Sequence, residues 1–100
     1  MNTKPLTTKQ KAYLRSLAHH RSVIITVGNA GLTAPVIAEL ELALARHELL
    51  KVKLPSIHRD QRSELAQKIA TTMNAELVQE IGRIGVFYRR GEKPKIEIPR

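Results

Sequence analysis

The chain has 100 residues, 42% of them hydrophobic, which is enough for one small hydrophobic core and too little for a multi-lobed enzyme. It has no cysteine, which excludes disulfides, thiolate zinc sites and cysteine nucleophiles and suits a reducing, cytoplasmic compartment. Its 17 Lys and Arg against 9 Asp and Glu give a net charge of +8, which favours a polyanionic partner such as nucleic acid.

The excess of positive charge is concentrated at the two ends of the chain. Residues 1–21, from Lys4 onward, hold five Lys and Arg and no acid; residues 82–100 hold six against two acids, and residues 22–81 hold six against seven. A high net charge also serves solubility alone, and that alternative stays open here. The longest run of Val, Ile and Leu is Val23–Ile25, so we expect no signal peptide and no membrane span, and one folded domain over residues 1–100.

The first predicted elements are a helix and a strand. The helix is predicted to begin near Thr7, because Thr7 and Gln10 stand at the spacing of a capping box. Leu14 and Leu17 follow helical periodicity on its inner side. Three cations lie away from these leucines: Lys9, Lys11 and Arg15. The nearly continuous apolar residues of Ser22–Val27 are typical of a strand covered on both faces or placed beside helices.

A turn, a helix and a second strand come next. After the turn over Gly28–Leu32, Thr33 and Pro35 predict the start of a helix, which should run to about His47. The following strand alternates apolar residues with cations, so one face is expected to be buried and the other basic. Its apolar residues are Leu50, Val52 and Leu54, and its cations are Lys51 and Lys53.

A third helix is predicted to follow this strand along the chain. Asp60 is its expected cap and it should run to about Asn74. Arg62 is expected to point toward solvent. The core side is expected to hold Leu65, Ile69 and Met73.

Two strands should follow as a hairpin. Glu76–Ile81 and Val86–Arg90 flank a bend at Gly82–Gly85, a spacing typical of antiparallel pairing. A short edge strand could follow at Ile96 and Ile98. The predicted order is therefore α-β-α-β-α-β-β, an α/β fold in which two right-handed strand–helix–strand crossovers place helices against a mixed four-stranded sheet. We expect a compact two-layer sandwich.

The sharpest local feature is the glycine-rich turn between the first strand and the second helix. Gly28 and Gly31 let the backbone approach a ligand closely, and the helix after Thr33 presents unpaired N–H groups that favour phosphate. The alternative is that both glycines only supply positive φ for a tight turn. The turn lacks the Gly-Lys-Ser/Thr end of a P-loop and the third glycine of a dinucleotide fingerprint, so nucleotide hydrolysis is not predicted.

Several stretches of the chain resemble one known family. They are Val27–Thr33, Ile37–Glu41, His47–Lys53 and Val86–Arg89. They resemble the CRM domain (chloroplast RNA splicing and ribosome maturation) in its stand-alone bacterial YhbY-type form, and the resemblance covers essentially the whole chain. It implies a non-catalytic RNA-binding fold similar to the C-terminal domain of bacterial initiation factor 3, acting with ribosomal RNA or precursors of the large subunit (pre-50S particles).

The resemblance also implies that the glycine loop of the family lies at Gly28, Asn29, Ala30 and Gly31. Ala30 stands where family members often have a polar residue, so contacts there are expected from the backbone alone. The residues themselves outline a basic surface on which an RNA backbone could run. It combines the loop and Thr33 with cations at Lys9, Lys11, Arg15, Arg21, Lys51, Lys53 and Arg89.

Each of these lysines, taken alone, is also explained as an ordinary solvated side chain. The three aromatic residues are too few for a base-stacking platform, so recognition by shape and backbone is expected. Tyr88 is expected in the core rather than against a base.

Two other functions stay open. A small ribonuclease or RNA-modifying enzyme would draw its acid and base from the four histidines and the carboxylates, but no pair stands on one obvious face. A basic adaptor would bind acidic protein surfaces without preference for RNA. We predict no metal, cofactor or small-molecule substrate, and we favour a monomer.

Overall fold

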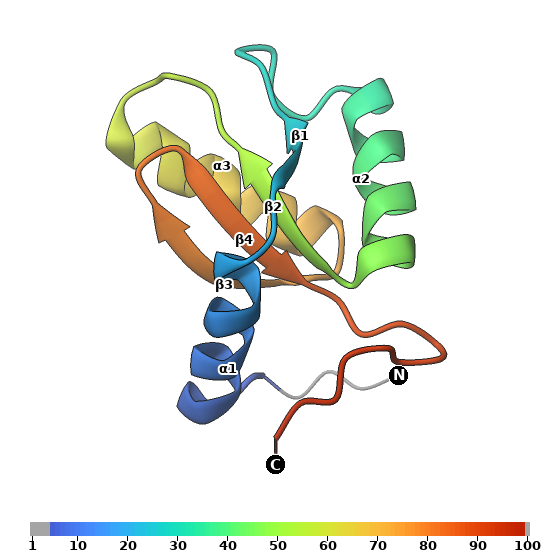
Figure 1. Ribbon diagram of the computed structural model, residues 1–100. Coiled ribbons are helices and arrows are strands. Elements are labelled where there is room, and N and C mark those ends of the chain that lie inside the picture. Colours follow the sequence, from blue (N-terminus) through green and yellow to red (C-terminus); the bar gives the residue numbers. More distant parts are fainter. Residues whose placement is uncertain (1–4, 100) are drawn as a thin grey trace.

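The computed structural model describes residues 5–99 (Figure 1). Lys4 and Arg100, which contribute to the two basic ends, lie outside this range. The elements follow one another in the predicted order: α1 (Thr8–His19), β1 (Val23–Thr26), α2 (Ala34–His47), β2 (Leu49–Lys53), α3 (Arg59–Thr72), β3 (Glu76–Ile81) and β4 (Ile84–Tyr88). None of the described helices is long and apolar enough to cross a membrane.

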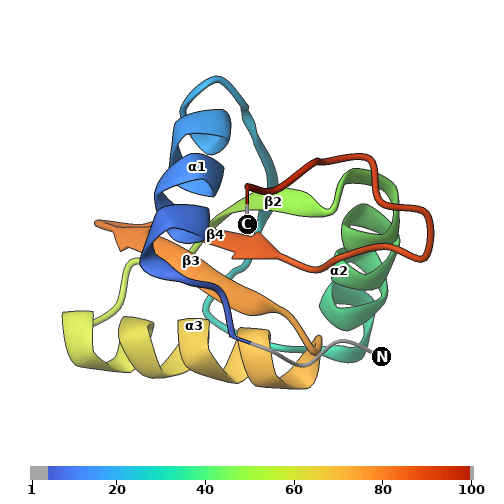
Figure 2. The same cartoon turned by 90° about the horizontal axis from the view of Figure 1, so that it is seen from below.

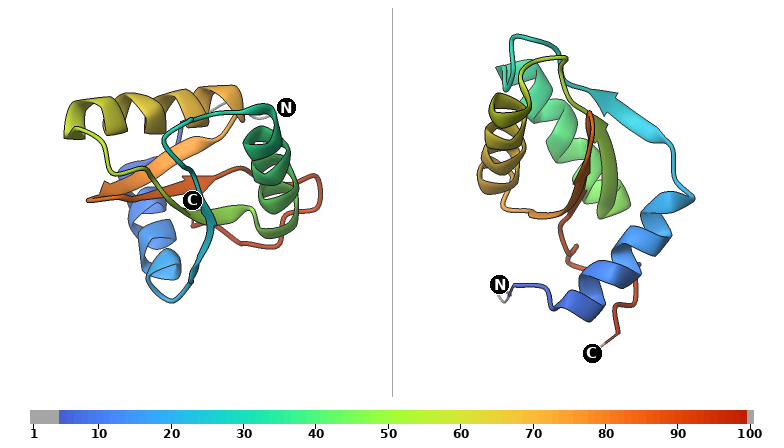
Figure 3. Two further views of the ribbon diagram at one scale, coloured as in Figure 1. Left: turned by 90° about the horizontal axis from the view of Figure 1, so that it is seen from above. Right: turned by 90° about the vertical axis from the view of Figure 1, so that its left-hand side faces the viewer.

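The predicted mixed sheet is confirmed, and its strand order is β1-β2-β4-β3. β1 runs parallel to β2, whereas β4 runs antiparallel to both β2 and β3. The hairpin therefore folds β4 back into the space between β2 and β3, which leaves β1 and β3 as the two edges. Figures 2 and 3 show α1 on one face of this sheet and α2 and α3 on the other.

Short-range side-chain contacts start the first two helices. The Thr7 hydroxyl accepts from the Gln10 N–H at 3.1 Å and the Gln10 side chain accepts from the Thr7 N–H at 2.9 Å, so the predicted capping box is present. Thr33 caps α2 through the Val36 N–H, with Pro35 in the first turn. Both starts are local, so the sequence pattern predicted them correctly.

The core occupies both faces of the sheet, because side chains alternate along each strand. On β2, Leu50 and Val52 join the larger cluster beneath α2 and α3, whereas Leu49 joins a smaller cluster beneath α1. The sheet with α2 and α3 thus forms the predicted sandwich. In addition, α1 and the segment 91–99 cover part of the opposite face, where Ile96 and Ile98 pack against the smaller cluster without forming a strand in the described residues.

Of the two alternatives for the first strand, coverage on both faces is wrong. β1 is an edge strand, and only Ile25 within it is buried, followed by Val27 just beyond its end. Val23 and Ile24 are 39% and 49% exposed. The run of apolar residues thus combines the buried Ile25 and Val27 with the exposed Val23 and Ile24 of an open edge.

The predicted cap of the third helix is also wrong. His58 is the N-cap, its Nδ1 accepts from the Asp60 N–H at 3.2 Å, and Asp60 lies in the first turn, where its charge faces the positive end of the helix dipole. Arg62 is half-buried rather than solvated, because its guanidinium donates to the Ile57 carbonyl at 2.9 Å. An imidazole is an unusual cap, which is why Asp60 was the stronger sequence signal.

The hairpin bend is shorter than predicted. Ile81 pairs directly with Ile84, so only Gly82 and Arg83 form the turn, and Gly82 has a φ of 54°. Gly85 lies inside β4, opposite Val52 of β2. Its role is therefore in packing rather than in the turn.

Candidate functional site

The glycine loop connects β1 to α2 at one end of the sheet, at the top of Figure 1. Gly31 donates to the Gly28 carbonyl at 3.0 Å and has a φ of 73°, which favours glycine. A Cβ on Gly31 would lie 4.0 Å from Leu65 of α3, so this side of the loop is anchored. A Cβ on Gly28 would meet nothing within 4 Å. The two glycines therefore differ: Gly31 shapes the turn and Gly28 leaves its outer side open.

The N-terminal end of α2 offers fewer unpaired N–H groups than the sequence predicted. Pro35 has no N–H, and the Val36 N–H is taken by the Thr33 hydroxyl at 3.4 Å. Among the first three residues of the helix, only the Ala34 N–H has no partner within the described part of the chain. A ligand at the loop would therefore meet mainly the exposed backbone of residues 28–30.

A groove of about 190 Å³ lies between α1 and the part of the sheet that α1 leaves uncovered. Arg15 and His19 line it from α1, Lys51 from β2 and Ile81 from β3. No carboxylate of the described residues lines it. The groove thus brings together two of the predicted cations, Arg15 and Lys51.

Lys53 links this groove to the glycine loop. Leu49 faces α1, so alternation places Lys51 and Lys53 on the same side of β2. Lys53 is exposed, and its carbonyl accepts from the Val27 N–H at 2.8 Å, next to the first residue of the loop. The basic face predicted for this strand therefore ends beside the glycines.

The remaining cations on and after α1 take different directions. Lys11 lies one helical turn before Arg15 and so extends the groove side of the helix, whereas Lys9 lies on the outer side, away from the sheet. The Arg21 guanidinium donates to the carbonyls of His47 and Leu49 at 3.3 and 3.0 Å. Arg21 therefore points away from the groove, toward the end of α2.

Arg89 is not brought to this surface. It follows β4 at the end of the sheet opposite the loop, and its guanidinium makes a bidentate ion pair with Glu41 at 2.8 and 2.9 Å. It also donates to the Met73 carbonyl at 3.1 Å. These contacts join α2 and α3 to the end of β4, which is a structural role.

The Glu41–Arg89 pair predicts a small acid sensitivity. Hydrogen bonding from Arg89 holds the pKa of the Glu41 carboxyl below its usual value. Such a group stabilises the fold above its unfolded pKa, and this contribution is lost as the pH falls through the lowered folded pKa. Because Glu41 is 55% exposed, we expect Glu41→Gln to cost at most about 1 kcal/mol at neutral pH. Urea unfolding of both proteins along a series from neutral to acid pH measures this, and a difference that stays constant throughout would contradict it.

The family is decided by the whole pattern of residues. The sequence model of the CRS1 / YhbY (CRM) domain matches residues 6–89, which include α1, the glycine loop and all four strands. The chain belongs to the CRM domain family. This confirms the resemblance read from the sequence, and membership of this non-catalytic family supports the expectation of a protein without enzymatic activity.

Relatives and a solved structure agree with this assignment. The CRM chain is 44% identical over 95 residues to an RNA-binding protein of Haemophilus influenzae, covering 95% of this chain and 96% of the relative. It is 43% identical to a candidate RNA-binding protein of Pseudomonas aeruginosa, covering 89% and 86%. A solution structure of a hypothetical protein from Staphylococcus aureus, considered an RNA-binding candidate, superposes with a TM-score of 0.82 at 40% identity, covering 94% and 99%.

Two residues near this surface were not predicted as RNA-binding residues from the sequence. Arg83 is exposed in the hairpin turn, and its Nε donates to the Leu54 carbonyl at 3.0 Å, which places it at the same end of the sheet as the glycine loop. His19 lines the groove beside Arg15. The position of His19 four residues after Arg15 was a usable signal.

Tyr88, by contrast, is 5% exposed in the core, as expected, and burial raises the pKa of its hydroxyl.

Proposed function

We propose that this CRM chain is a non-catalytic, monomeric, cytoplasmic RNA-binding protein of one domain. In this proposal it binds ribosomal RNA, or precursors of the large ribosomal subunit, during ribosome assembly. The observation that carries the proposal is one basic surface. It runs from the groove at Arg15 and Lys51, past Lys53, to the open side of the glycine loop at Gly28.

The charges on this face are arranged to attract phosphate. Acids on neighbouring β3 are occupied elsewhere: Glu76 accepts from the Leu6 N–H at 3.0 Å and Glu80 accepts from the Ser63 hydroxyl at 3.0 Å. Cations that are not paired with carboxylates lose little when they meet a phosphate backbone, and they release counterions from it. The face therefore favours polyanions.

The distribution of aromatic residues favours recognition of the backbone over stacking of bases. Phe87 and Tyr88 are buried in the two core clusters, and Tyr13 is 37% exposed. One exposed ring does not make a stacking platform. The named function of the Haemophilus influenzae relative, at 44% identity over nearly the full length, supports RNA as the polyanion.

The loop proposal is tested by Gly28→Val. A Cβ at Gly28 has open space, so the fold should be unchanged, while the bulky side chain would hold a phosphate away from the backbone of residues 28–30. We expect affinity for a large-subunit ribosomal RNA fragment to fall about tenfold, the loss of one hydrogen bond to a charged group. Fluorescence anisotropy measures it, with thermal unfolding as the check on folding. Unchanged affinity in the folded variant would remove the loop from the interface.

A matched pair of lysines tests the basic face. Lys53→Gln removes a cation beside the loop, whereas Lys9→Gln removes one from the outer side of α1. Only the first should reduce the dependence of affinity on salt, by about 0.7 in the log–log slope for a single-stranded contact. Equal effects of the two variants would indicate nonspecific attraction.

Crosslinking in growing cells then tests the ribosomal target, because crosslinks scattered over many RNAs would contradict it.

A further inference from the structure

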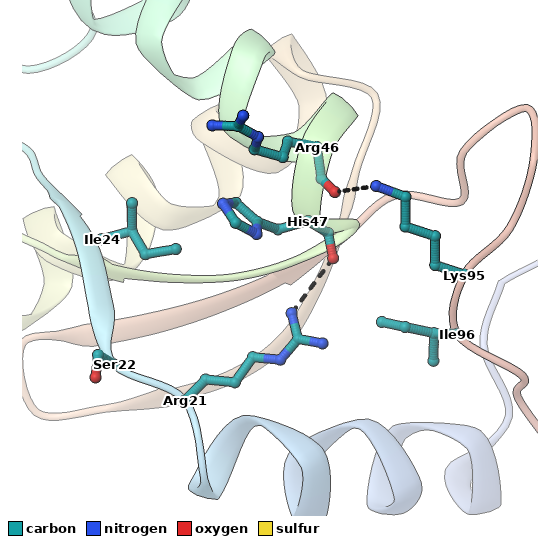
Figure 4. Close-up of a pocket in the computed structure, with 7 residues that line it drawn as sticks. All are labelled: Arg21, Ser22, Ile24, Arg46, His47, Lys95 and Ile96. Carbon is teal, nitrogen blue, oxygen red and sulfur yellow. Dashed lines mark hydrogen bonds between the residues drawn. The ribbon is translucent and has the colours of Figure 1, made fainter.

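A second concave site lies beside the edge strand β1, between its first residues, the end of α2 and the segment 91–99 (Figure 4). Its volume is about 400 Å³, within the range of small-molecule pockets. Four of the lining residues are basic: Arg21, Arg46, His47 and Lys95. Ile24 and Ile96 supply apolar walls, and no carboxylate of the described residues lines the site.

Backbone carbonyls hold two of the three Lys and Arg side chains in place. The Arg21 guanidinium donates to the carbonyls of His47 and Leu49, and the Lys95 ammonium donates to the Arg46 carbonyl at 2.8 Å. The carbonyls lie around the C-terminal end of α2, where the helix dipole favours cations. A guanidinium has five N–H donors and an ammonium has three, so both groups keep donors for a ligand.

The segment that carries Lys95 and Ile96 is itself fixed. The buried Glu48 carboxylate accepts from the N–H groups of Gly91, Lys95 and Ile96 at 2.7, 2.9 and 3.0 Å. Glu48 itself does not line the pocket, because its oxygens face the backbone of the segment. The pocket is therefore an open hollow in which Arg21 and Lys95 are held in place by backbone carbonyls.

The shape of the site and its apolar walls indicate more than a bare anion. Ile24 is 49% exposed, and Ile96 is partly buried on another wall. In Figure 4 the imidazole of His47 lies between Ile24 and the Arg21 guanidinium, and Ile96 lies beyond that guanidinium. An anion that also carries a flat apolar group satisfies both kinds of wall. A nucleotide has this chemistry.

We propose that this pocket binds a nucleotide, with its phosphate among the basic side chains and its base against Ile24. The proposal rests on the proposed function, because we infer that the nucleotide belongs to bound RNA. The groove and the pocket lie on two sides of the connection between α1 and β1, where the Lys51 ammonium donates to the Arg21 carbonyl at 3.1 Å. An RNA strand that leaves the groove reaches the pocket by crossing this connection.

The direct test is a nuclear magnetic resonance titration of the full chain with adenosine 5′-monophosphate, with adenosine and inorganic phosphate as the two partial ligands. We expect saturable shifts at the amides around the pocket, and tighter binding of the nucleotide than of either part. Arg46→Gln/Lys95→Gln should weaken nucleotide binding about tenfold or more. The control Lys68→Gln/Lys93→Gln removes the same charge from an exposed helix position and an exposed position of the segment, and should have no effect. Ile24→Ser should weaken binding of the nucleotide and leave that of phosphate unchanged.

The outcomes separate this pocket from the loop. Absence of saturable shifts in the folded chain would overturn the proposal. Arg21 and Lys95 would then serve only as donors to the carbonyls around the C-terminal end of α2. A 5′-phosphorylated RNA oligonucleotide that shifts the same amides supports RNA as the source. Shifts with the mononucleotide alone would overturn that source and assign the pocket to a free nucleotide. Because the mononucleotide does not require the glycine loop, its binding stands even if Gly28→Val leaves RNA affinity unchanged.

Discussion

Replacement of Glu48 by Ala is expected to lower the free energy of unfolding by about 2–4 kcal/mol, because three backbone donors lose their acceptor at once. Glu48 is 1% exposed, and its carboxylate accepts from Gly91, Lys95 and Ile96. Water can hydrate the N–H groups of a released segment, so the loss of stability is smaller than the full cost of burying three unpaired donors. The packing of Ile96 and Ile98 against the smaller cluster should be lost with it. Chemical denaturation gives the energy, and amide exchange at the three donors locates the change.

Two further variants distinguish the contribution of the Glu48 carboxylate from that of the backbone conformation at Glu48. Glu48 has a φ of 62°, which glycine adopts without strain, so Glu48→Gly should be less damaging than Glu48→Ala although both remove the clamp. Gly91→Ala should loosen the clamp without changing charge, because its Cβ would lie 2.8 Å from the Glu48 carboxylate. Protection of the three amides that persists in Glu48→Ala would show that the segment is held by other contacts.

Substitution of Gly85 by Ala is expected to cost about 1–3 kcal/mol, the usual penalty of an overpacked core. The added Cβ would lie 2.9 Å from the Phe87 ring and 3.6 Å from Leu54. Phe87 is 1% exposed and lies in the larger cluster between the sheet and two helices, so its ring has no free space to enter. Gly28→Ala is the matched control, because its Cβ meets nothing, and should change stability by less than about 0.5 kcal/mol.

A double-mutant cycle identifies Phe87 as the cause. If the ring is the obstacle, Gly85→Ala should cost less in a Phe87→Leu background than in the native chain. Thermal unfolding of the four proteins provides the coupling energy. Strict additivity would place the strain in the backbone of β4 instead.

The elements that the sequence predicted correctly depend on neighbours along the chain. The capping box of Thr7 and Gln10 and the cap of Thr33 join residues three apart, so their geometry follows from the helix alone. The alternation of β2 similarly places Leu50 and Val52 together before any partner strand is known. The misplaced cap of α3 shows the limit of such rules, since His58 competes with Asp60 within the same turn.

The candidate site was predictable in its parts and not in its assembly. The glycine loop, Arg15, Lys51 and Lys53 were visible as residue types, but the meeting of Arg15 and Lys51 in one groove depends on α1 crossing the sheet beside β2. Arg89 looked equivalent to them in the sequence. Its pairing with Glu41, 48 residues away, removes it from that group, and no local pattern encodes such a contact.

The sequence by itself determined the order of the elements, the starts of α1 and α2, the basic character of the chain and its CRM family. Only the tertiary structure decided that β4 lies between β2 and β3, that β1 is an open edge, and that Glu48 holds a segment 43–48 residues further along the chain. The physical reason is the range of the interactions. Caps and periodicity act over a few residues, whereas strand insertion, ion pairs and buried carboxylates are fixed when distant segments exclude water together.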